Sequence, residues 1–401
     1  MKILWVNPNL LHPTHRGGQI RTLGMLQELS RRHEVHYVAF AGRNNQEGIA
    51  RSGEYCAQLH TIEWEPVDKA SLAFLGQLVS GLFHPMPLAV SRFYHASMRR
   101  LVESLLVRER FDRVVCDYLA SAPHMPALGE SLLFQHNVET VIWRRRLEHA
   151  ADPLRRFYFR RQAERMLEYE GRVCRAAGHI VAVSTVDAEV MRSLYGVTRV
   201  TEIPTGVDIE FFAPPPDPAP AADLVFVGAM DWMANIDGIT HFAEQILPLI
   251  RRRRPDCTLA IAGRTPDAKI LELAERDPKI RVTGTVPDIR PYLWGSRVAI
   301  VPLRVGGGTR LKIYEAMAAK VPVVSTGVGA EGLEFEPEEN IRIADQPEEF
   351  ARHCLELLES PFQRQRMAEA AWEMVARRFS WQQVARCFEK ILEIAPRASA
   401  R

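Results

Sequence analysis

The sequence has no pair of cysteines spaced for a zinc site or a local disulfide. Its six cysteines lie far apart, and no C-x-x-C pair or short cysteine–histidine spacing connects them. This absence argues against structural zinc and favours a reduced, cytoplasmic protein. The cysteines are Cys56, Cys116, Cys174, Cys257, Cys354 and Cys387.

Long apolar runs are missing as well. A spanning helix needs about 18 uninterrupted apolar residues, and the nearest candidate, Leu72 to Val90, is broken by His84, Pro85 and Pro87. The apolar run at the N-terminus is too short for a signal peptide and is interpreted as a first strand. We therefore expect no spanning helix, although Leu72 to Val90 stays open as a segment that lies at a membrane surface.

An excess of charge of one sign is also absent. The chain carries 51 basic and 49 acidic residues, a net charge of +2, whereas nucleic-acid binders normally have a strong basic excess. The first strand, loop and helix of the chain lack G-x-G-x-x-G and have only the pair Gly17-Gly18, which disfavours a dehydrogenase. With 401 residues, 47% of them hydrophobic and 25% charged, the chain is globular and long enough for two domains.

Short apolar runs separated by helical patterns predict an α/β fold for the first half. The loop before the first helix contains Gly17 and Gly18, which stays open as a flexible turn or a ligand-binding loop. An expected strand, 132–134, runs into Gln135 and His136, and open α/β sheets bind ligands at the carboxyl ends of their strands. The expected strands are 3–6, 35–40, 113–116, 132–134 and 179–184, with helices at 20–32 and 186–195.

An arginine-rich segment, residues 143–175, is expected to be helical throughout. It carries ten arginines against five acidic residues. Such a run is usually a solvated face, and the alternative is a basic surface that meets anionic lipid headgroups. Further on, residues 213–223 hold five prolines and are interpreted as a linker between two domains.

In the second half, expected strands end repeatedly in glycine. Gly228 follows 224–227, Gly263 and Arg264 follow 257–262, and Gly284 follows 280–283. Because the strands of a parallel sheet end at one edge, we expect these glycines on a common rim. The expected helices of this half are 236–253, 350–358, 361–378 and 381–394, the last with an apolar stripe of Val384, Phe388 and Ile391 interpreted as packing.

A strand, a glycine loop, a helix and a second strand follow one another from 298 to 324. The loop amides of Gly307, Gly308 and Thr309 at a helix N-terminus suit a phosphate group. On the helix that follows, Lys312 and Glu315 share the face of Thr309. Lys312 and Glu315 as an ordinary solvated pair remain the alternative.

The segment GGGTRLKIYEAMAAKVPVVST, from Gly306 to Thr326, resembles the donor-site signature of family 4 retaining glycosyltransferases. Its GGGTRLK form is similar to a branch with sugar transferases of exopolysaccharide assembly. His136 with Asn137 and the Gly17-Gly18 pair also resemble family motifs. Two departures stand out: Gly307 occupies a position where many members have Glu, and the loop after Gly228 lacks the usual Arg and Lys.

The resemblance implies the α/β fold called GT-B, with two Rossmann-like domains facing an interdomain cleft. These would be residues 1–212, joined by the linker 213–223 to residues 224–380, with a final helix, 381–401, packing back on the first domain. It also implies retaining transfer of a sugar from a nucleoside diphosphate sugar to a glycan or lipid-linked acceptor. No metal or cofactor is expected beyond that donor. The location would be cytoplasmic or at the inner face of the membrane.

The resemblance also implies roles for individual residues. His136 would orient the sugar, Arg310 and Lys312 would hold the diphosphate, and Glu315 would hold the ribose. Two alternatives of other classes stay open, namely a nucleotide-sugar epimerase of similar fold and a non-catalytic nucleotide-sugar-binding protein. The expected donor-binding residues are Gly17, Gly18, Gly228, Gly263, Arg264, Val286, Gly307, Gly308 and Thr309.

Overall fold

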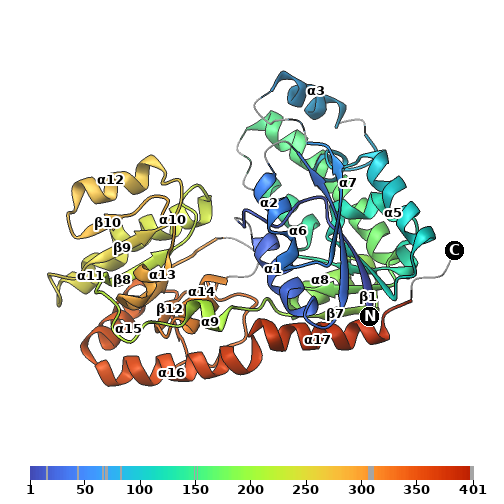
Figure 1. Ribbon diagram of the computed structural model, residues 1–401. Coiled ribbons are helices and arrows are strands. Elements are labelled where there is room, and N and C mark those ends of the chain that lie inside the picture. The colour runs from blue at the N-terminus through green and yellow to red at the C-terminus, as the bar shows by residue number, and fades with distance from the viewer. Residues whose placement is uncertain are drawn as a thin grey trace. The chain divides into compact units, whose positions relative to one another are not determined.

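The computed structural model consists of two compact units, each with its own parallel β-sheet (Figure 1). The first unit comprises residues 1–204 and 384–401, and the second comprises residues 205–383. The predicted α/β class is therefore confirmed. The structure describes residues 1–14, 17–42, 45–65, 67, 71–81, 84–148, 150, 152–305 and 311–397.

The first unit contains a seven-stranded sheet in the order β3-β2-β1-β4-β5-β6-β7. Its central strands are mostly apolar and buried, because helices cover both faces of such a sheet. The strands are β1 (Lys2–Val6), β2 (Glu34–Ala41), β3 (Gln58–Glu63), β4 (Arg113–Asp117), β5 (Leu132–Phe134), β6 (His179–Ala182) and β7 (Val200–Glu202). The helices include α1 (Gly17–Leu29), α2 (Gln46–Ala50), α3 (Leu72–Ser80), α4 (Leu88–Ser91), α5 (Ala96–Arg108), α6 (Glu139–Glu148), α7 (Pro153–Ala176) and α8 (Thr185–Tyr195).

Two predictions for this unit are wrong in detail. Gly17 and Gly18 are the first residues of α1 and not part of the preceding loop. The arginine-rich segment forms two helices, because Asp152 caps a new helix by accepting a hydrogen bond from the Arg155 backbone N–H at 2.8 Å. Strand β3 was not predicted, because its sequence, QLHTIE, contains no apolar run.

The second unit contains a six-stranded sheet in the order β10-β9-β8-β11-β12-β13. Its strands are β8 (Ala222–Val227), β9 (Leu259–Ala262), β10 (Ile280–Val282), β11 (Ser296–Val301), β12 (Val323–Ser325) and β13 (Arg342–Ile343). Its helices include α9 (Ile209–Phe212), α10 (Met233–His241), α11 (Leu247–Arg251), α12 (Ala268–Arg276), α13 (Arg290–Trp294), α14 (Leu311–Ala318), α15 (Pro347–Glu359) and α16 (Pro361–Arg378).

The helix expected at 236–253 is longer and interrupted. It begins at Met233, and a π-helical turn, η4 (Phe242–Ile246), separates α10 from α11. Pro248 lies in the first turn of α11. Proline has no N–H to donate to the preceding turn, so a regular helix is interrupted at this point.

The chain around the proline-rich segment is hydrogen-bonded to the second unit. The Phe212 carbonyl accepts a hydrogen bond from the Trp294 indole at 2.8 Å, and the Ala221 N–H donates to the Gly295 carbonyl at 2.7 Å. The two units accordingly divide between Pro204 and Thr205, before the prolines.

Helix α17 (Trp381–Ile394) enters the first unit at Val384 and runs below its strands in Figure 1. The stripe of Val384, Phe388 and Ile391 is buried, which confirms its interpretation as packing. The Phe388 ring lies 5.7 Å from that of Trp5. The helix is thereby anchored to the first strand of the chain.

Candidate functional site

A pocket of about 220 Å³ opens at the carboxyl ends of β1, β4 and β5 in the first unit. It brings together two of the predicted residues, Gly18 and His136. Gly17, which was also predicted, directly precedes Gly18 in the chain. A Cβ atom on Gly18 would lie 3.7 Å from Cγ of the His136 ring. The lining residues are Asn7, Asn9, Gly18, Gln19, Tyr118, Gln135, His136, Asn137 and Glu139.

The imidazole of His136 is held by a buried carboxylate. His136 Nε2 lies 2.7 Å from Oδ1 of Asp117, the last residue of β4. The other oxygen, Oδ2, accepts hydrogen bonds from the Trp5 indole (2.8 Å), the Asn7 amide (2.6 Å) and the Thr22 hydroxyl (2.8 Å). This network fixes the ring plane of His136 at the rim of the sheet.

Asp117 is ionised in this environment. Burial alone would raise its pKa, but the adjacent His136 and the hydrogen bonds from His136, Trp5 and Thr22 outweigh burial and lower the pKa below its ordinary value. The prediction missed Asp117, because the expected strand stopped one residue earlier. A carboxylate directly after the apolar run of β4 was the available signal.

The other face of the His136 site is set by an aromatic residue in an unusual conformation. The Tyr118 ring lies 5.9 Å from the His136 imidazole. Tyr118 has a backbone φ of +52°, a value that residues other than glycine rarely adopt. Its N–H donates to the Phe134 carbonyl at 2.7 Å. Such backbone strain often accompanies functional sites, which is consistent with the position of Tyr118 in the pocket wall.

Arg21 of α1 supports the carboxyl ends of the same sheet, and it was not among the predicted residues. Its buried guanidinium donates to the Gln135 carbonyl and, at 2.8 Å, to the Ile203 carbonyl. It lies 4.2 Å from the centroid of the Phe134 ring. Burial lowers its pKa to about 9, with the charge of Asp117 acting in the opposite direction. The arginine therefore joins the ends of β5 and β7 beside His136.

Glu139, in the pocket wall, begins α6, and the N-terminus of this helix is capped by another buried carboxylate. Glu170 of α7 accepts hydrogen bonds from the backbone N–H groups of Glu139 (3.0 Å) and Thr140 (2.8 Å) and from the Tyr195 hydroxyl (2.6 Å). This long-range cap satisfies N–H groups that have no partner within the helix. It also fixes where Glu139 enters the pocket.

In the second unit the predicted glycines lie at the carboxyl ends of their strands, Gly228 after β8 and Gly263 after β9. A Cβ atom on Gly263 would lie 1.7 Å from the Gly228 carbonyl oxygen, so this close approach requires glycine. Arg264 is half exposed and lies 3.6 Å from the Asp231 carboxylate. Val286 lies half-buried in the loop between β10 and α13.

Lys312 of α14 extends to the same rim. Its ammonium donates to the Asn235 side-chain carbonyl at 2.9 Å and lies 4.3 Å from the Phe226 ring centroid. A Cβ atom on Gly228 would lie 2.8 Å from the Lys312 nitrogen, so glycine makes room for this cation. Asn235, which also donates to the Ala229 carbonyl, was not among the predicted residues.

Glu315 lies one helical turn after Lys312 and is half-buried. Burial raises its pKa to about 7, and the charge of Lys312 acts in the opposite direction. The rest of the predicted phosphate site, Gly307, Gly308, Thr309 and Arg310, lies outside the described residues. Its arrangement stays a prediction.

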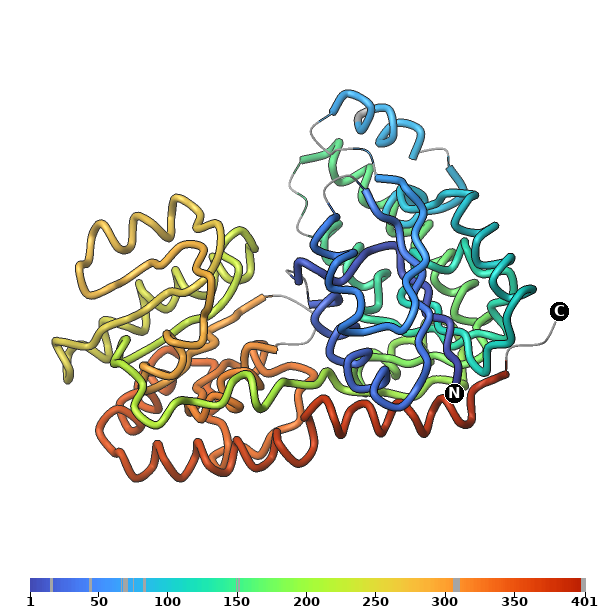
Figure 2. Tube along the Cα trace, viewed as in Figure 1, coloured from blue at the N-terminus to red at the C-terminus, as the bar shows by residue number. Residues whose placement is uncertain are grey.

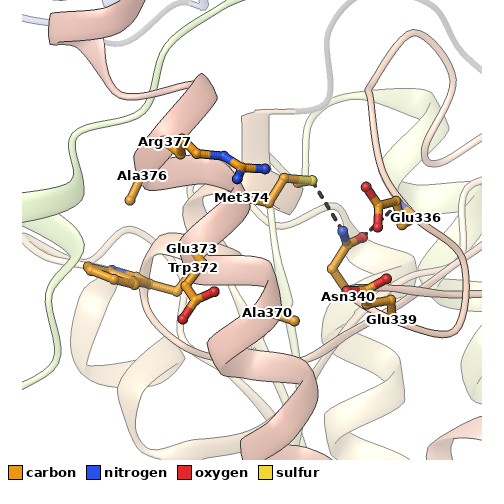
Figure 3. Close-up of a pocket in the computed structure, with 9 residues that line it drawn as sticks. All are labelled: Glu336, Glu339, Asn340, Ala370, Trp372, Glu373, Met374, Ala376 and Arg377. Atoms are coloured by element: carbon orange, nitrogen blue, oxygen red, sulfur yellow. Dashed lines mark hydrogen bonds between the residues drawn. The ribbon is translucent and has the colours of Figure 1, made fainter.

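A larger pocket, of about 630 Å³, lies elsewhere in the second unit (Figure 3). Its wall includes three carboxylates, Glu336, Glu339 and Glu373, beside Asn340, whose side chain is held by the Glu336 N–H and by Met374. None of the predicted site residues lines it. Volume alone therefore does not identify the functional site.

The described ranges contain neither a cluster of metal-ligating side chains nor a helix that could span a membrane. In these ranges no group of three or more His, Cys, Asp or Glu side chains is placed to hold a metal ion. Likewise, no helix there combines the length and the apolar character needed to cross a membrane.

Family models match both halves of the chain. Residues 15–211 match the model described as Glycosyltransferase Family 4, and residues 221–360 match the one described as glycosyl transferases group 1. Among individual proteins, the chain is 20% identical over 376 residues to an uncharacterized 44.6 kDa protein in the cps region of Klebsiella pneumoniae, which covers 88% of this chain and 90% of that protein. It is 31% identical over 169 residues to O-antigen chain mannosyltransferase B of Escherichia coli, covering 39% and 42% of the two chains.

The solved structures agree in fold. Anabaena Alr3699/HepE in complex with UDP superposes with a TM-score of 0.70 at 14% identity, covering 98% of this chain and 100% of that one. WaaG, a glycosyltransferase involved in lipopolysaccharide biosynthesis, gives a TM-score of 0.63 at 14% identity over 98% and 99% of the two chains. The predicted GT-B fold is thus confirmed. Since the two family matches together take in most of the sequence, the chain is a family 4-like glycosyltransferase.

Proposed function

We propose that the protein is a retaining, metal-independent glycosyltransferase of the hexosyltransferase type. It moves a sugar from a nucleoside diphosphate sugar to an acceptor hydroxyl in bacterial polysaccharide or cell-envelope glycan assembly. The observation that carries the proposal is the cation at the rim of the second sheet, where Lys312 is held by Asn235 above Gly228 with Glu315 one turn away. This set suits a diphosphate joined to a ribose.

Each residue has a role in the proposal. Lys312 neutralises the diphosphate as it leaves, together with Arg310 and the amides of Gly307, Gly308 and Thr309. Glu315 accepts hydrogen bonds from the ribose hydroxyls. In the first unit, His136 orients the transferred sugar, held in position by Asp117. Donor binding in the proposal also involves Gly17 and Gly18 at the start of α1 in the first unit and, in the second unit, Gly228, Gly263, Arg264 and Val286.

The structural neighbours support the donor class. Structures of Anabaena Alr3699/HepE contain UDP and, in another crystal, UDP-glucose. A thermal-shift screen with UDP, GDP and ADP sugars tests this part of the proposal directly. A ligand at 100 times its dissociation constant adds about 2.7 kcal/mol of stability. A clear shift with one nucleotide series is expected, and no shift with any of them contradicts the proposal.

The first unit also offers a surface suited to a lipid-linked acceptor. Leu72 of α3 is 85% exposed and Leu154 of α7 is 77% exposed. The Gly81 carbonyl after α3 accepts a hydrogen bond from Gln162 of α7 at 3.1 Å, so these two helices are tied together. In Figure 2, α3 lies at the end of the first unit opposite α17.

Exposed arginines flank these apolar residues on α7: Arg155, Arg156, Arg160 and Arg161. Basic side chains beside exposed apolar ones are typical of surfaces that bind anionic membranes. We propose a cytoplasmic location, with catalysis at the inner face of the membrane. The amphipathic surface would hold the first unit where a lipid-linked acceptor lies.

Removing two of these arginines is expected to weaken membrane binding. The double variant Arg155→Gln/Arg156→Gln should bind phosphatidylglycerol-containing liposomes about 30-fold more weakly, because each basic residue near an anionic surface contributes about 1 kcal/mol. Co-sedimentation at low salt measures the loss. The matched double variant Arg252→Gln/Arg276→Gln, on the second unit, should bind like the wild type. If the wild type does not bind these liposomes at low salt, the proposed membrane-binding surface is wrong.

A further inference from the structure

We propose that a cluster of arginines at the amino ends of the strands in the second unit binds a soluble anion that carries a phosphate group. The cluster consists of Arg254, Arg297 and Arg364, which lie around Asp223. Asp223 and Arg297 are each the second residue of their strand, β8 and β11. The site is therefore at the opposite edge of the sheet from the predicted donor residues, and it does not depend on the proposed transferase function.

The cluster contains more positive than negative charge. Oδ1 of Asp223 lies 3.0 Å from Nη1 of Arg297 and 3.8 Å from Nη2 of Arg254. Its other oxygen, Oδ2, accepts hydrogen bonds from the backbone N–H and the hydroxyl of Thr258, at 3.0 and 3.2 Å. Because three arginines stand against one aspartate, an excess of two positive charges remains.

Two of the three arginines are fixed at the carboxyl end of α15. Nη1 of Arg364 donates to the carbonyls of Leu357 and Leu358, at 2.7 and 3.1 Å. Nη1 of Arg254 donates to the same Leu358 carbonyl at 3.2 Å. The carboxyl end of a helix is equivalent to only about half a negative charge. These contacts hold the two guanidinium groups side by side, but they do not cancel the positive excess.

The like charges also act on one another. Burial lowers the pKa of Arg364, and the charges of Arg297 and Arg254 lower it further, while Asp223 acts in the opposite direction. The charged residues next to the cluster form balanced pairs, Arg251 with Asp277 and Arg253 with Glu359. An anion bound at the cluster would relieve the repulsion among its three guanidinium groups.

The guanidinium groups are accessible to a ligand, whereas the carboxylate is largely covered. The side chain of Arg297 is 49% exposed and that of Arg254 is 30% exposed, against 14% for Asp223. Arginine has five N–H donors. Within the described part of the chain, the guanidinium of Arg297 has one partner, the carboxylate of Asp223. Several donors of the cluster therefore remain available.

A phosphate group fits this arrangement better than a carboxylate does. A phosphate monoester carries a charge of about −1.5 to −2 at pH 7, which matches the excess of two positive charges. Its oxygens can accept hydrogen bonds from more than one guanidinium group, and arginine binds phosphate in a bidentate geometry. A carboxylate would neutralise only one of the two charges.

Hydrogen exchange of the backbone amides, with inorganic pyrophosphate as the probe, tests the site. At ten times its dissociation constant, pyrophosphate should slow exchange in wild-type peptides that cover residues 296–300 and 357–364 by about 10-fold. Arg297→Gln should bind the probe about 10-fold more weakly, because it loses a hydrogen bond to a charged group. At the same pyrophosphate concentration, exchange in this variant should then slow by only about 2-fold.

Matched variants and salts make the result specific. Arg297→Lys keeps the positive charge and should keep part of the slowing. Arg276→Gln loses an exposed arginine of α12 that is paired with Glu272, and it should behave like the wild type. Without pyrophosphate, Arg297→Gln should exchange like the wild type, which shows that it is folded. Sodium chloride at the same ionic strength should not slow exchange in these peptides.

Three results would overturn the inference. The first is unchanged exchange of residues 357–364 in the wild type with pyrophosphate, including the case in which only peptides near Lys312 respond. The second is equal slowing by sodium chloride. The third comes from phosphatidylglycerol vesicles, which present the phosphate in a lipid headgroup: slowing of these peptides by vesicles and not by pyrophosphate would exclude a soluble ligand. The donor proposal is tested separately, since its screen uses nucleotide sugars.

Discussion

Replacing Lys312 by alanine is expected to lower turnover by about 100- to 1000-fold. A preorganised donor that stabilises a leaving group contributes about 3 to 4 kcal/mol to catalysis. Lys312 is preorganised, because Asn235 accepts one of its hydrogen bonds at 2.9 Å and the Phe226 ring lies 4.3 Å from its nitrogen. The release of nucleoside diphosphate by EDTA-treated enzyme measures the effect.

The control for this variant is Lys279→Ala. Lys279 lies in the same unit, before the amino end of β10, where its ammonium bonds the Pro255 carbonyl and Asp256. The Lys279→Ala variant loses the same positive charge, but at the amino end of a strand and not at the carboxyl ends, where Lys312 lies. Its turnover should equal that of the wild type. Near-normal turnover of Lys312→Ala would contradict the cation mechanism. So would wild-type activity that disappears with EDTA and returns with Mg²⁺ or Mn²⁺.

Replacing Asp117 by alanine is expected to destabilise the first unit by about 3 to 5 kcal/mol. The loss of this carboxylate leaves the buried Trp5, Asn7 and Thr22 donors without an acceptor, and each buried group left unpaired costs about 1 to 3 kcal/mol. Hydrogen exchange of the β1 and β4 amides measures the loss in this unit alone, without assuming that both units unfold together.

Asp112→Ala serves as the matched control, because Asp112 precedes β4 and is exposed, with one hydrogen bond from the Lys2 N–H. Its loss should cost no more than about 1 kcal/mol. The comparison belongs at neutral pH. The folded pKa of Asp117 is lowered, so its stabilisation is present above the ordinary value of 3.8 and disappears as the pH falls through the folded pKa. Equal hydrogen-exchange protection in Asp117→Ala and Asp112→Ala would show that Asp117 does not stabilise the carboxyl ends of these strands.

Many of the site residues at the carboxyl ends of the strands could be predicted from local sequence. Gly228 and Gly263 each come directly after a short apolar run, and His136 follows its strand by two residues. Parallel strands end at one edge, so these positions had to lie near one another within each sheet. Local pattern and topology together determine this part of the site.

The supporting residues could not be predicted in the same way. Asp117 receives hydrogen bonds from residues about 100 positions earlier, and Lys312 meets Asn235 across 77 positions. A single sequence carries no sign of which polar side chains will meet over such separations. Glu170 is a similar case, since its place on an arginine-rich helix indicates a solvated charge, yet it is fully buried as a cap for α6.

The measurement that tests the central claim most directly is the anomeric form of the sugar first released from its donor. An α-linked nucleotide sugar that gives a thermal shift is incubated with the enzyme in EDTA, with water as the acceptor, and followed by proton NMR from the first seconds. A retaining, metal-independent transferase releases the α-anomer first, before it equilibrates in solution. Initial release of the β-anomer, or conversion of the donor into an epimer without release, would contradict the account.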